Sequence, residues 1–517
     1  MEQEDWNILS WKILGNFLNE YKNKLTKQQL DSYNVFINEN ISKSIRQFNP
    51  IILQGDSYDD NKLEIIIGGE NDGGHIKNTG GNIYFGKPYI NEKDNQTRIL
   101  LPNEARLKNL TYMSCIYADI HVLLYNNIDS RKYDELKTFT KVPIGNVPIM
   151  LQSDICNLNN LNENALIQAG ECKYDKGGYF IIDGKEKVII AQERQVENKL
   201  YVRKNKNIDD RYLIETEIRS SPENKVQPAR LTKVYILNKK KDMDNVIRVK
   251  IPLIDEDVPL MILFRALGIT SDQEILEYIL GDLDTTYSQK AIGFLLPTIR
   301  DSGVLKTKYE AYLYLQNIIT FKEKDGKDYK PKGNNNNAPD PYIQDKQSDI
   351  ENIEFAYITD LLRKWLLPHI NDNPQDKAFF LGYMVKETLD VYLDGKKVTD
   401  RDNLSYKCID MSGFLISAIF RDLYFRLKNN FIEECNKNAN NRKAGIDQKI
   451  VNKIDNFISD VTDSHIHIEK MFKKSWITDG MMYTFKNCWG LKGSSGACKE
   501  GVVQDLNRLS YLGYLSH

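Results

Sequence analysis

The sequence predicts an α+β protein with more than one domain, and three observations support this prediction. The chain has 517 residues, enough for two or three domains and a sizeable core. Apolar residues recur at helical spacing within residues 6–47 and again from Ser412 to Cys435. Between them lie short apolar runs of β type, separated by glycine-rich turns. We therefore expect domains that contain both mixed β-sheets and helices.

Two amphipathic helices are expected first, within residues 6–47. From Ile51 to about Val122 the pattern changes to short runs such as Leu63–Ile67, which indicates a β-rich region. The glycine-rich segment 68–81 lacks the G-x-x-x-x-G-K-[ST] spacing of a phosphate-binding loop. It is therefore interpreted as a flexible turn, and an autonomous enzyme built on it has little support.

Residues 177–202 predict a β-hairpin. Apolar runs at Phe180–Ile182 and Val188–Ala191 flank the turn pair Asp183-Gly184 and the charged residues 185–187, which are expected at the hairpin tip. Taken alone, the pattern also fits a solvated turn on an antiparallel sheet.

Residues 197–366 predict a second domain of mixed α and β structure. Within it, residues 322–349 are poor in apolar residues and rich in Asn, Pro and charge, so a mobile surface loop is expected. Helical pattern returns after Pro374. The apolar stripe in Ser412–Cys435 is interpreted as core, and residues 436–447 as an exposed connection.

Charge and cysteine content limit the possible functions. The 70 Lys and Arg against 72 Asp and Glu give a net charge of −2, so nucleic-acid binding would need a local basic surface. No apolar run approaches the roughly 20 residues that span a bilayer, and the N-terminus lacks a signal-peptide pattern, so a soluble chain with no membrane partner is expected. Seven cysteines without a CxxC pair suggest reduced thiols. His465 and His467 could be metal ligands, but a solvent-facing pair is the simpler interpretation.

Residues 473–508 combine positive charge with aromatic side chains. Six basic residues against three acidic ones give a local balance of 6 − 3 = +3, and Trp476, Tyr483, Phe485 and Trp489 are interleaved with them. Such a mixture can follow a phosphate backbone and stack on bases. A solvated face with buried aromatic residues has the same composition, so both interpretations stay open.

Seven segments match the sequence motifs of one protein family, and they occur in the same order. They are the hairpin GGYFIIDGKEKVIIAQER, LPNEARLKNLTYMSCIYAD (101–119), PIMLQSDIC (148–156), VPLMILFRALGITSDQEILE (258–277), LPHINDNPQDKAFFLGYMV (367–385), TDRDNLSYKCIDMSG (399–413) and GVVQDLNR (501–508). On these segments the chain resembles the N-terminal portion of the second-largest (beta-like) subunit of multisubunit DNA-directed RNA polymerase, of the eukaryotic or large-DNA-virus type. The resemblance covers most of the chain.

The resemblance implies an architecture and a function. Residues 1–196 and 367–472 would form the protrusion domain from two chain segments, residues 197–366 the lobe, and residues 473–517 a partial fork. The chain would form one wall of the DNA cleft and contact the RNA–DNA hybrid during transcription. It would end inside the fork, as the N-terminal half of a longer subunit. The alternative is a free-standing nucleic-acid-binding or interaction protein derived from that subunit.

The resemblance also implies nucleic-acid-binding residues. Lys187 matches the hairpin lysine, Gln504 the fork glutamine, and Lys499 a fork arginine whose charge it keeps without the bidentate geometry. Arg508 ends the matched segment GVVQDLNR and is either structural or RNA-facing. The fork loop departs from the family pattern at Cys488, Leu491 and Gly493.

The resemblance implies partners rather than catalysis by this chain alone. The sequence has no D-x-D-x-D run, so no catalytic or metal-binding residue is expected in it. Mg²⁺ would be held by the largest subunit of the assembled nucleotidyltransferase, and zinc would bind in a C-terminal part beyond the matched region. Expected partners are the largest and smaller polymerase subunits, template DNA and nascent RNA. The location would be the nucleus, or a cytoplasmic viral compartment or virion.

Overall fold

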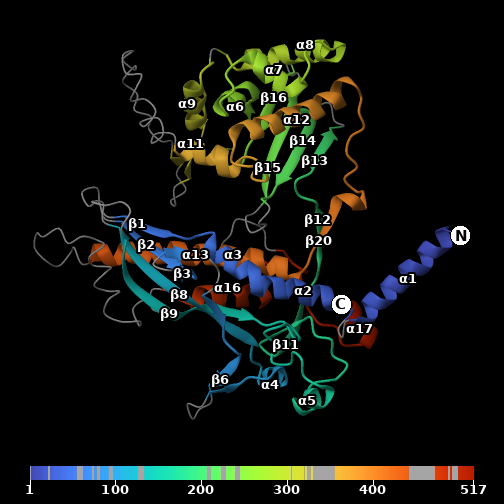
Figure 1. Cartoon of the computed structure of the whole chain (residues 1–517), viewed down its shortest axis with the longest axis vertical. Coiled ribbons are helices and arrows are strands. Elements are labelled where there is room, and N and C mark those ends of the chain that lie inside the picture. Colours follow the sequence, from blue (N-terminus) through green and yellow to red (C-terminus); the bar gives the residue numbers. More distant parts are fainter. Residues whose placement is uncertain are drawn as a thin grey trace, which may run out of the picture. The chain divides into compact units, whose positions relative to one another are not determined.

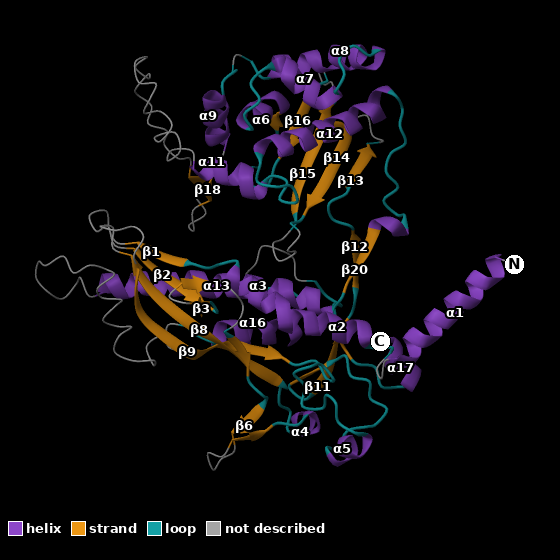
Figure 2. Ribbon diagram, viewed as in Figure 1, coloured by secondary structure: helices purple, strands orange, loops and turns teal. Residues whose placement is uncertain are grey.

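The computed structural model describes residues 2–517 with internal gaps (Figures 1 and 2). The residues left out are 21–23, 55–61, 73–74, 78–81, 92–96, 126–132, 206–210, 223–228, 239–244, 255, 304, 319–320, 323–327, 330–355, 442–471, 487–488 and 492–498. The expected loop 322–349 lies mostly outside the described residues, and so do His465, His467 and the second half of the connection 436–447. The first half of that connection, residues 436–441, belongs to the helix Ser412–Asn441, which differs from the expected connection. The glycine-rich segment 68–81, expected as a flexible turn, contains two short paired strands at Glu70–Asp72 and His75–Lys77, while its residues 73–74 and 78–81 lie outside the described residues. Within the described ranges, no helix is long and apolar enough to cross a membrane.

The chain folds into two compact units. The first unit comprises residues 1–193 and 409–517, and the second comprises residues 194–408. The chain passes between them through β12 (Gln192–Gln195) and β20 (Lys407–Asp410), which pair in a two-stranded sheet. Helices and strands occur in both units, which confirms the predicted α+β class.

The C-terminal boundary of the second unit differs from the expected one. The sequence placed residues 367–472 with the N-terminal segment, whereas residues 367–408 belong to the second unit. The reason is packing: helix α12 (Pro374–Leu393) buries Leu381, Met384 and Val385 in the same apolar core as Ile275 and Ile279. The assignment of the units to protrusion, lobe and fork stays a prediction.

The first unit places helices against a sheet (Figure 1). The strands of this sheet follow the order β1 (Ile51–Gln54), β2 (Lys62–Ile67), β8 (Met113–Tyr125), β5 (Ile83–Phe85), and β9 (Tyr133–Pro148) also pairs with β8. Its helices are α1 (Glu2–Glu20), α2 (Lys27–Val35), a π-helical turn at Phe36–Asn40, α3 (Ile41–Arg46), α13 (Ser412–Asn441) and α16 (Ser475–Lys486). Short elements complete it: β3 (Glu70–Asp72), β4 (His75–Lys77), β6 (Tyr89–Asn91), β7 (Thr97–Ile99), α4 (Pro102–Leu107), α5 (Glu163–Gln168) and α17 (Tyr511–Ser516).

The core of the first unit is built from both of its chain segments. Tyr33 and Phe36 from the N-terminal helices, Phe139 from β9 and Phe420 from α13 are all fully buried in it. The apolar stripe in Ser412–Cys435 is therefore core, as the sequence predicted. A side chain at Gly413 would place its Cβ 1.8 Å from the carbonyl oxygen of Ser32, so glycine is required where α13 begins against α2. The two segments thus form one domain.

Helix α1 differs from the other helices of this unit. The sequence predicts an amphipathic helix here, but Trp6, Trp11, Ile13 and Phe17 are at least half exposed in the structure. Burial of the N-terminal region is provided instead by α2 and α3, through residues such as Tyr33 and Ile41.

The second unit is an antiparallel sheet covered by helices. The strand order is β13 (Leu200–Lys204), β14 (Tyr212–Ser220), β15 (Arg230–Leu237), β16 (Ile247–Lys250), β17 (Val258–Pro259). Its helices are α6 (Leu260–Ala266), α7 (Asp272–Leu280), α8 (Thr286–Asp301), α9 (Lys308–Ile318), α11 (Ala356–Asp360), a π-helical turn at Leu361–Trp365 and α12. β18 (Phe321–Lys322) and β19 (Asp328–Tyr329) form a separate pair.

A buried lysine joins the start of α12 to the π-helical turn. Lys377 is 1% exposed, and its Nζ donates to the carbonyl oxygens of Leu362 (3.2 Å), Arg363 and Leu366 (2.8 Å). Burial lowers the pKa of Lys377 from 10.5 to about 8, because the apolar surroundings disfavour the charged form.

This lowered pKa predicts a stability that depends on pH. Above pH 8 the folded chain releases the Lys377 proton, whereas the unfolded chain retains it up to about pH 10.4. The unfolding free energy therefore rises with pH between these two values, and this gain is absent below pH 8. We expect the unfolding free energy of the wild type, relative to Lys377→Met, to rise by about 2–3 kcal/mol between pH 7 and 10.5 in urea titrations. The exposed Lys397→Met is the control and should run parallel to the wild type. Parallel curves for Lys377→Met would contradict the lowered pKa.

Candidate nucleic-acid interface

The predicted hairpin forms and gains a third strand. β10 (Phe180–Ile182) and β11 (Lys185–Ile189) pair antiparallel, and Asp183 and Gly184 adopt φ of +47° and +75° in the turn. Such positive angles suit an Asp-Gly turn. Strand β21 (Val503–Asp505) pairs with β11 in the register Lys187↔Asp505, Val188↔Gln504 and Ile189↔Val503. The sequence did not predict this third strand.

Lys187 lies in a strand and not at the hairpin tip. It stands opposite Phe180 on one side and Asp505 on the other, because β11 already begins at Lys185. Its Nζ is 2.5 Å from Oδ1 of Asp505; the Lys187 side chain is 16% exposed and that of Asp505 is 66% exposed. The expected position of this lysine at the tip is therefore wrong.

Gln504 is exposed and held by short polar contacts. Its Nε2 donates to the carbonyl oxygen of Gly501 at 2.9 Å, and its Oε1 is 3.0 Å from Nε2 of His517. Nδ1 of His517 accepts from the amide of Asn507, so the proton on Nε2 points at Gln504. Side chains alternate along a strand, so Lys187 and Asp505 lie on one face of the sheet and Gln504 on the other.

The remaining basic residue, Lys499, lies on a separate bridge. Its backbone pairs with that of Trp489 through two hydrogen bonds of 3.1 Å, and its side chain is exposed. Trp489 is buried and packs edge-to-face on Phe485, which packs in the same way on Phe180. Phe485 and Trp489 are therefore core, whereas Trp476 is 44% exposed, so both interpretations of this mixture of basic and aromatic residues stay open.

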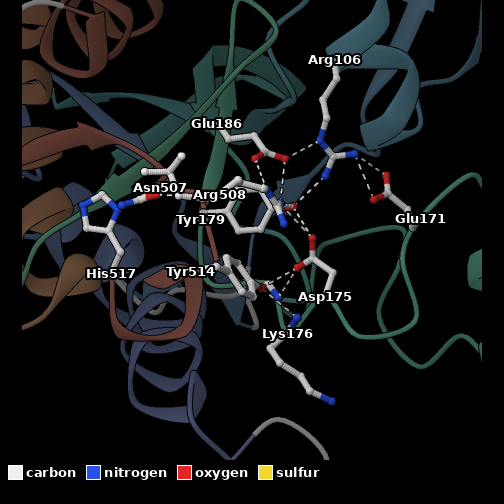
Figure 3. Close-up of polar contacts among 12 residues, drawn as sticks. Arg106, Glu171, Asp175, Lys176, Tyr179, Glu186, Asn507, Arg508, Tyr514 and His517 are labelled. Carbon is white, nitrogen blue, oxygen red and sulfur yellow. Dashed lines mark hydrogen bonds and ion pairs between the residues drawn. The ribbon is translucent and has the colours of Figure 1, made fainter. Parts of the chain in front are cut away.

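Arg508 is engaged in an ionic cluster (Figure 3). Its guanidinium donates to both carboxylate oxygens of Glu186 (2.6 and 2.9 Å), to Asp175 (3.1 Å) and to the hydroxyl of Tyr179 (3.0 Å). It also lies over the ring of Tyr514, 4.8 Å from the centroid. These contacts are compatible with a structural role for Arg508, and the choice between its structural and RNA-facing interpretations stays a prediction.

A second arginine completes the cluster. Arg106 at the end of α4 donates to Glu186 (2.8 Å), to Glu171 (2.7 Å) and to Tyr179 (2.7 Å), so Glu186 is shared by two guanidinium groups. The cluster joins helix α4, the hairpin, residues 171–179 and the C-terminal segment, which we define as residues 503–517. A cavity of about 490 Å³ borders it, lined by Cys172, Tyr174, Asp175, Arg508, Ser510, Tyr511 and Tyr514.

The carboxylates of the cluster differ in electrostatics. Burial raises the pKa of Glu171, and the contacts with Arg106 oppose this only in part. Burial also acts to raise the pKa of Asp175, but hydrogen bonds from Tyr179, the Gly177 amide and Tyr514, together with the charge of Arg508, outweigh it and lower the pKa. Asp175 is therefore held as a charged acceptor for the C-terminal segment.

No metal site accompanies these groups in the described part of the chain. Among those residues, no three His, Cys, Asp or Glu side chains are grouped so that they could hold a metal ion.

Sequence reasoning missed Asp505 and the two-arginine cluster. The 187–505 contact depends on the register of two strands that lie more than 300 residues apart, and no local pattern encodes that register. A usable signal was present for Arg106, since it lies in the motif PNEAR and the hairpin carries Glu186.

The chain is similar to known RNA polymerase subunits. Residues 24–459 match the family model described as RNA polymerase beta subunit. The chain is 31% identical over 533 residues to DNA-directed RNA polymerase II subunit 2 of Arabidopsis thaliana, covering 100% of this chain and 39% of that protein. It is 32% identical to DNA-directed RNA polymerase II subunit RPB2 of Encephalitozoon cuniculi, with 98% and 39% coverage. DNA-directed RNA polymerase subunit Rpo2N of Methanothermobacter thermautotrophicus is 26% identical, with 98% and 85% coverage. The chain thus spans about two fifths of the length of these eukaryotic relatives.

The ionic cluster predicts a stability effect at Arg508. Arg508→Met would leave Glu186 and Asp175 with less positive charge, so we expect a loss of about 1–2 kcal/mol in unfolding free energy, moderated because the arginine is 42% exposed. Arg508→Lys keeps the positive charge but loses the bidentate geometry of the guanidinium, so its loss of unfolding free energy should be smaller than that of Arg508→Met. Urea titration measures both.

Arg363→Met serves as the control, because it breaks an exposed ion pair with Asp372 that should contribute less than about 0.5 kcal/mol. An Arg508→Met chain as stable as this control would show that the cluster does not hold the C-terminal segment.

Proposed function

This chain belongs to the RNA polymerase beta subunit family, and on that premise we propose that it is the N-terminal part of the second-largest subunit of a DNA-directed RNA polymerase. In the proposed role it forms one wall of the DNA cleft and contacts the RNA–DNA hybrid. The observation that carries the proposal is the match itself, which extends through both compact units and covers 98–100% of the chain in its eukaryotic and archaeal relatives. A free-standing binding protein is not favoured, because the similarity to polymerase subunits extends over 98–100% of the chain.

The proposed activity belongs to an assembled enzyme. Nucleotidyl transfer would need Mg²⁺, which we assign to the largest subunit, and zinc would bind outside the matched region. The proposed partners are the largest and smaller subunits, template DNA and nascent RNA. The proposed location is the nucleus, and a cytoplasmic viral compartment or virion is the alternative.

Within this role, we propose Lys187 and Gln504 as contacts to the hybrid. Their support is the family resemblance together with their place on paired strands, where the Lys187 side chain is 16% exposed and Gln504 is exposed. Because they lie on opposite faces of the sheet, they are treated as independent contacts. Lys499 is a weaker candidate on an exposed bridge, and Arg508 is assigned to the ionic cluster instead.

The two contacts differ in charge, which provides a test in an assembled polymerase containing this chain. Lys187→Glu should shorten the lifetime of elongation complexes most at low KCl. The reason is that loss of one phosphate contact lowers, by about one, the steepness with which the logarithm of complex stability falls against the logarithm of the KCl concentration. Gln504→Ala loses a neutral hydrogen bond of about 1 kcal/mol, so a decrease of about fivefold that is independent of KCl is expected. Dissociation rates measured across a KCl series give both values.

Lys397→Glu in the second unit controls for the change in net charge. Equal salt slopes for Lys187→Glu and Gln504→Ala, or unchanged lifetimes for both, would remove these residues from the hybrid-binding surface.

The purified 517-residue chain should not synthesise RNA by itself. It spans 39% of the Arabidopsis relative, and the proposed Mg²⁺ carboxylates belong to another subunit. Template-dependent incorporation of labelled nucleotide is the measurement, with an assembled polymerase as the positive control. Activity that persists through an additional purification step would contradict this proposal.

A further inference from the structure

We propose that Asp505 attenuates the nucleic-acid contact of Lys187 by holding its ammonium group in an exchangeable ion pair on β11 and β21. This inference rests on the proposed function, because it needs Lys187 to contact the phosphate backbone. It adds a residue that sets the strength of that contact and its dependence on salt.

The geometry makes Asp505 the direct competitor of a phosphate. Lys187 and Asp505 are opposite each other in the antiparallel register, so their side chains lie on the same face of the sheet. The Nζ–Oδ1 distance of 2.5 Å shows a formed ion pair. A phosphate oxygen that approaches Lys187 must therefore replace Asp505 or share the ammonium with it.

The neighbouring charge on the same strand, Glu186, is paired differently. Glu186 is 17% exposed and is shared by Arg106 and Arg508, so it is fixed by two partners. Asp505 is 66% exposed, which makes its pair with Lys187 accessible to solvent. Because the Asp505 carboxylate lies mostly in solvent, a phosphate can replace it without rearrangement of the core. The hairpin turn carries another exposed ion pair, between Asp183 and Lys486, but Lys187 is the hairpin cation that the family resemblance assigns to the nucleic acid.

Charge balance gives the consequence. With Asp505 in place, the pair presents no net charge to a phosphate, and the carboxylate also repels the phosphate. Without the Asp505 charge, Lys187 presents a full positive charge and releases a counterion from the nucleic acid on binding. Asp505 therefore weakens the hold on the hybrid and favours movement along it.

Asp505→Asn tests the proposal because it removes the charge and keeps the shape. In an assembled polymerase containing this chain, we expect elongation complexes of Asp505→Asn to live roughly two- to fivefold longer at low KCl, with a log–log salt slope steeper by up to about one. Lys187→Gln should shorten the lifetime and flatten the slope. The double variant should behave like Lys187→Gln alone, because Asp505 acts through Lys187.

Asp479→Asn on α16 is the matched control, since it makes the same charge change at an exposed residue of the same unit. Thermal unfolding of each purified chain verifies that the variants fold.

The outcomes separate the two proposals. If Lys187→Gln is defective but Asp505→Asn behaves like Asp479→Asn, the role of Asp505 is overturned and the hybrid contact stands. An effect of Asp505→Asn that persists in the Lys187→Gln background also overturns it, because the carboxylate then acts without the lysine. If Lys187→Gln has no effect, the hybrid contact itself fails, and the proposed role of Asp505 fails with it.

Discussion

The pairing of β21 with β11 is the constraint on which the candidate interface depends. Three residue pairs in register bring the segment around Gln504 onto a hairpin that lies more than 300 residues earlier in the chain. Backbone hydrogen bonds alone would fix this strand weakly, since β21 is only three residues long. Arg508 strengthens the attachment of β21 from a position just after the strand, because its guanidinium binds Glu186 on β11 and Asp175 in the loop before the hairpin.

The hairpin in turn depends on a core formed by both segments of the first unit. Phe180 packs edge-to-face on Tyr33 of α2 and on Phe485 of α16, so residues from three distant parts of the sequence share one contact region. Tyr33 also donates to the carbonyl oxygen of Pro148 at 2.7 Å, at the end of β9. A rigid support of this kind is what a binding surface on short strands requires.

Three cations of the interface region serve different purposes because their environments differ. Arg106 and Arg508 face carboxylates that are at least four-fifths buried, so their charges are used to hold the fold. Lys187 faces a carboxylate that is mostly in solvent, so its charge stays available for exchange. Each type of cation suits its environment, because arginine provides bidentate geometry for fixed pairs and lysine provides a compact charge on a flexible stem.

The sequence by itself determined the local elements and the family of the chain. The turn at Asp183-Gly184, the apolar stripe of α13 and the β-type runs of the first unit follow from short-range patterns, because backbone preference and periodicity act over a few residues. Seven ordered segments sufficed to recognise the RNA polymerase beta subunit family.

Only the tertiary structure decided the relations between distant segments. It moved residues 367–408 into the second unit, because the apolar face of α12 is buried there. It also placed Lys187 opposite Asp505, put Gln504 on the other face of the sheet, and committed Arg508 to a cluster with Arg106. The physical reason is common to all of these: strand register and the pairing of charges are set by packing across hundreds of residues, which no local sequence pattern encodes.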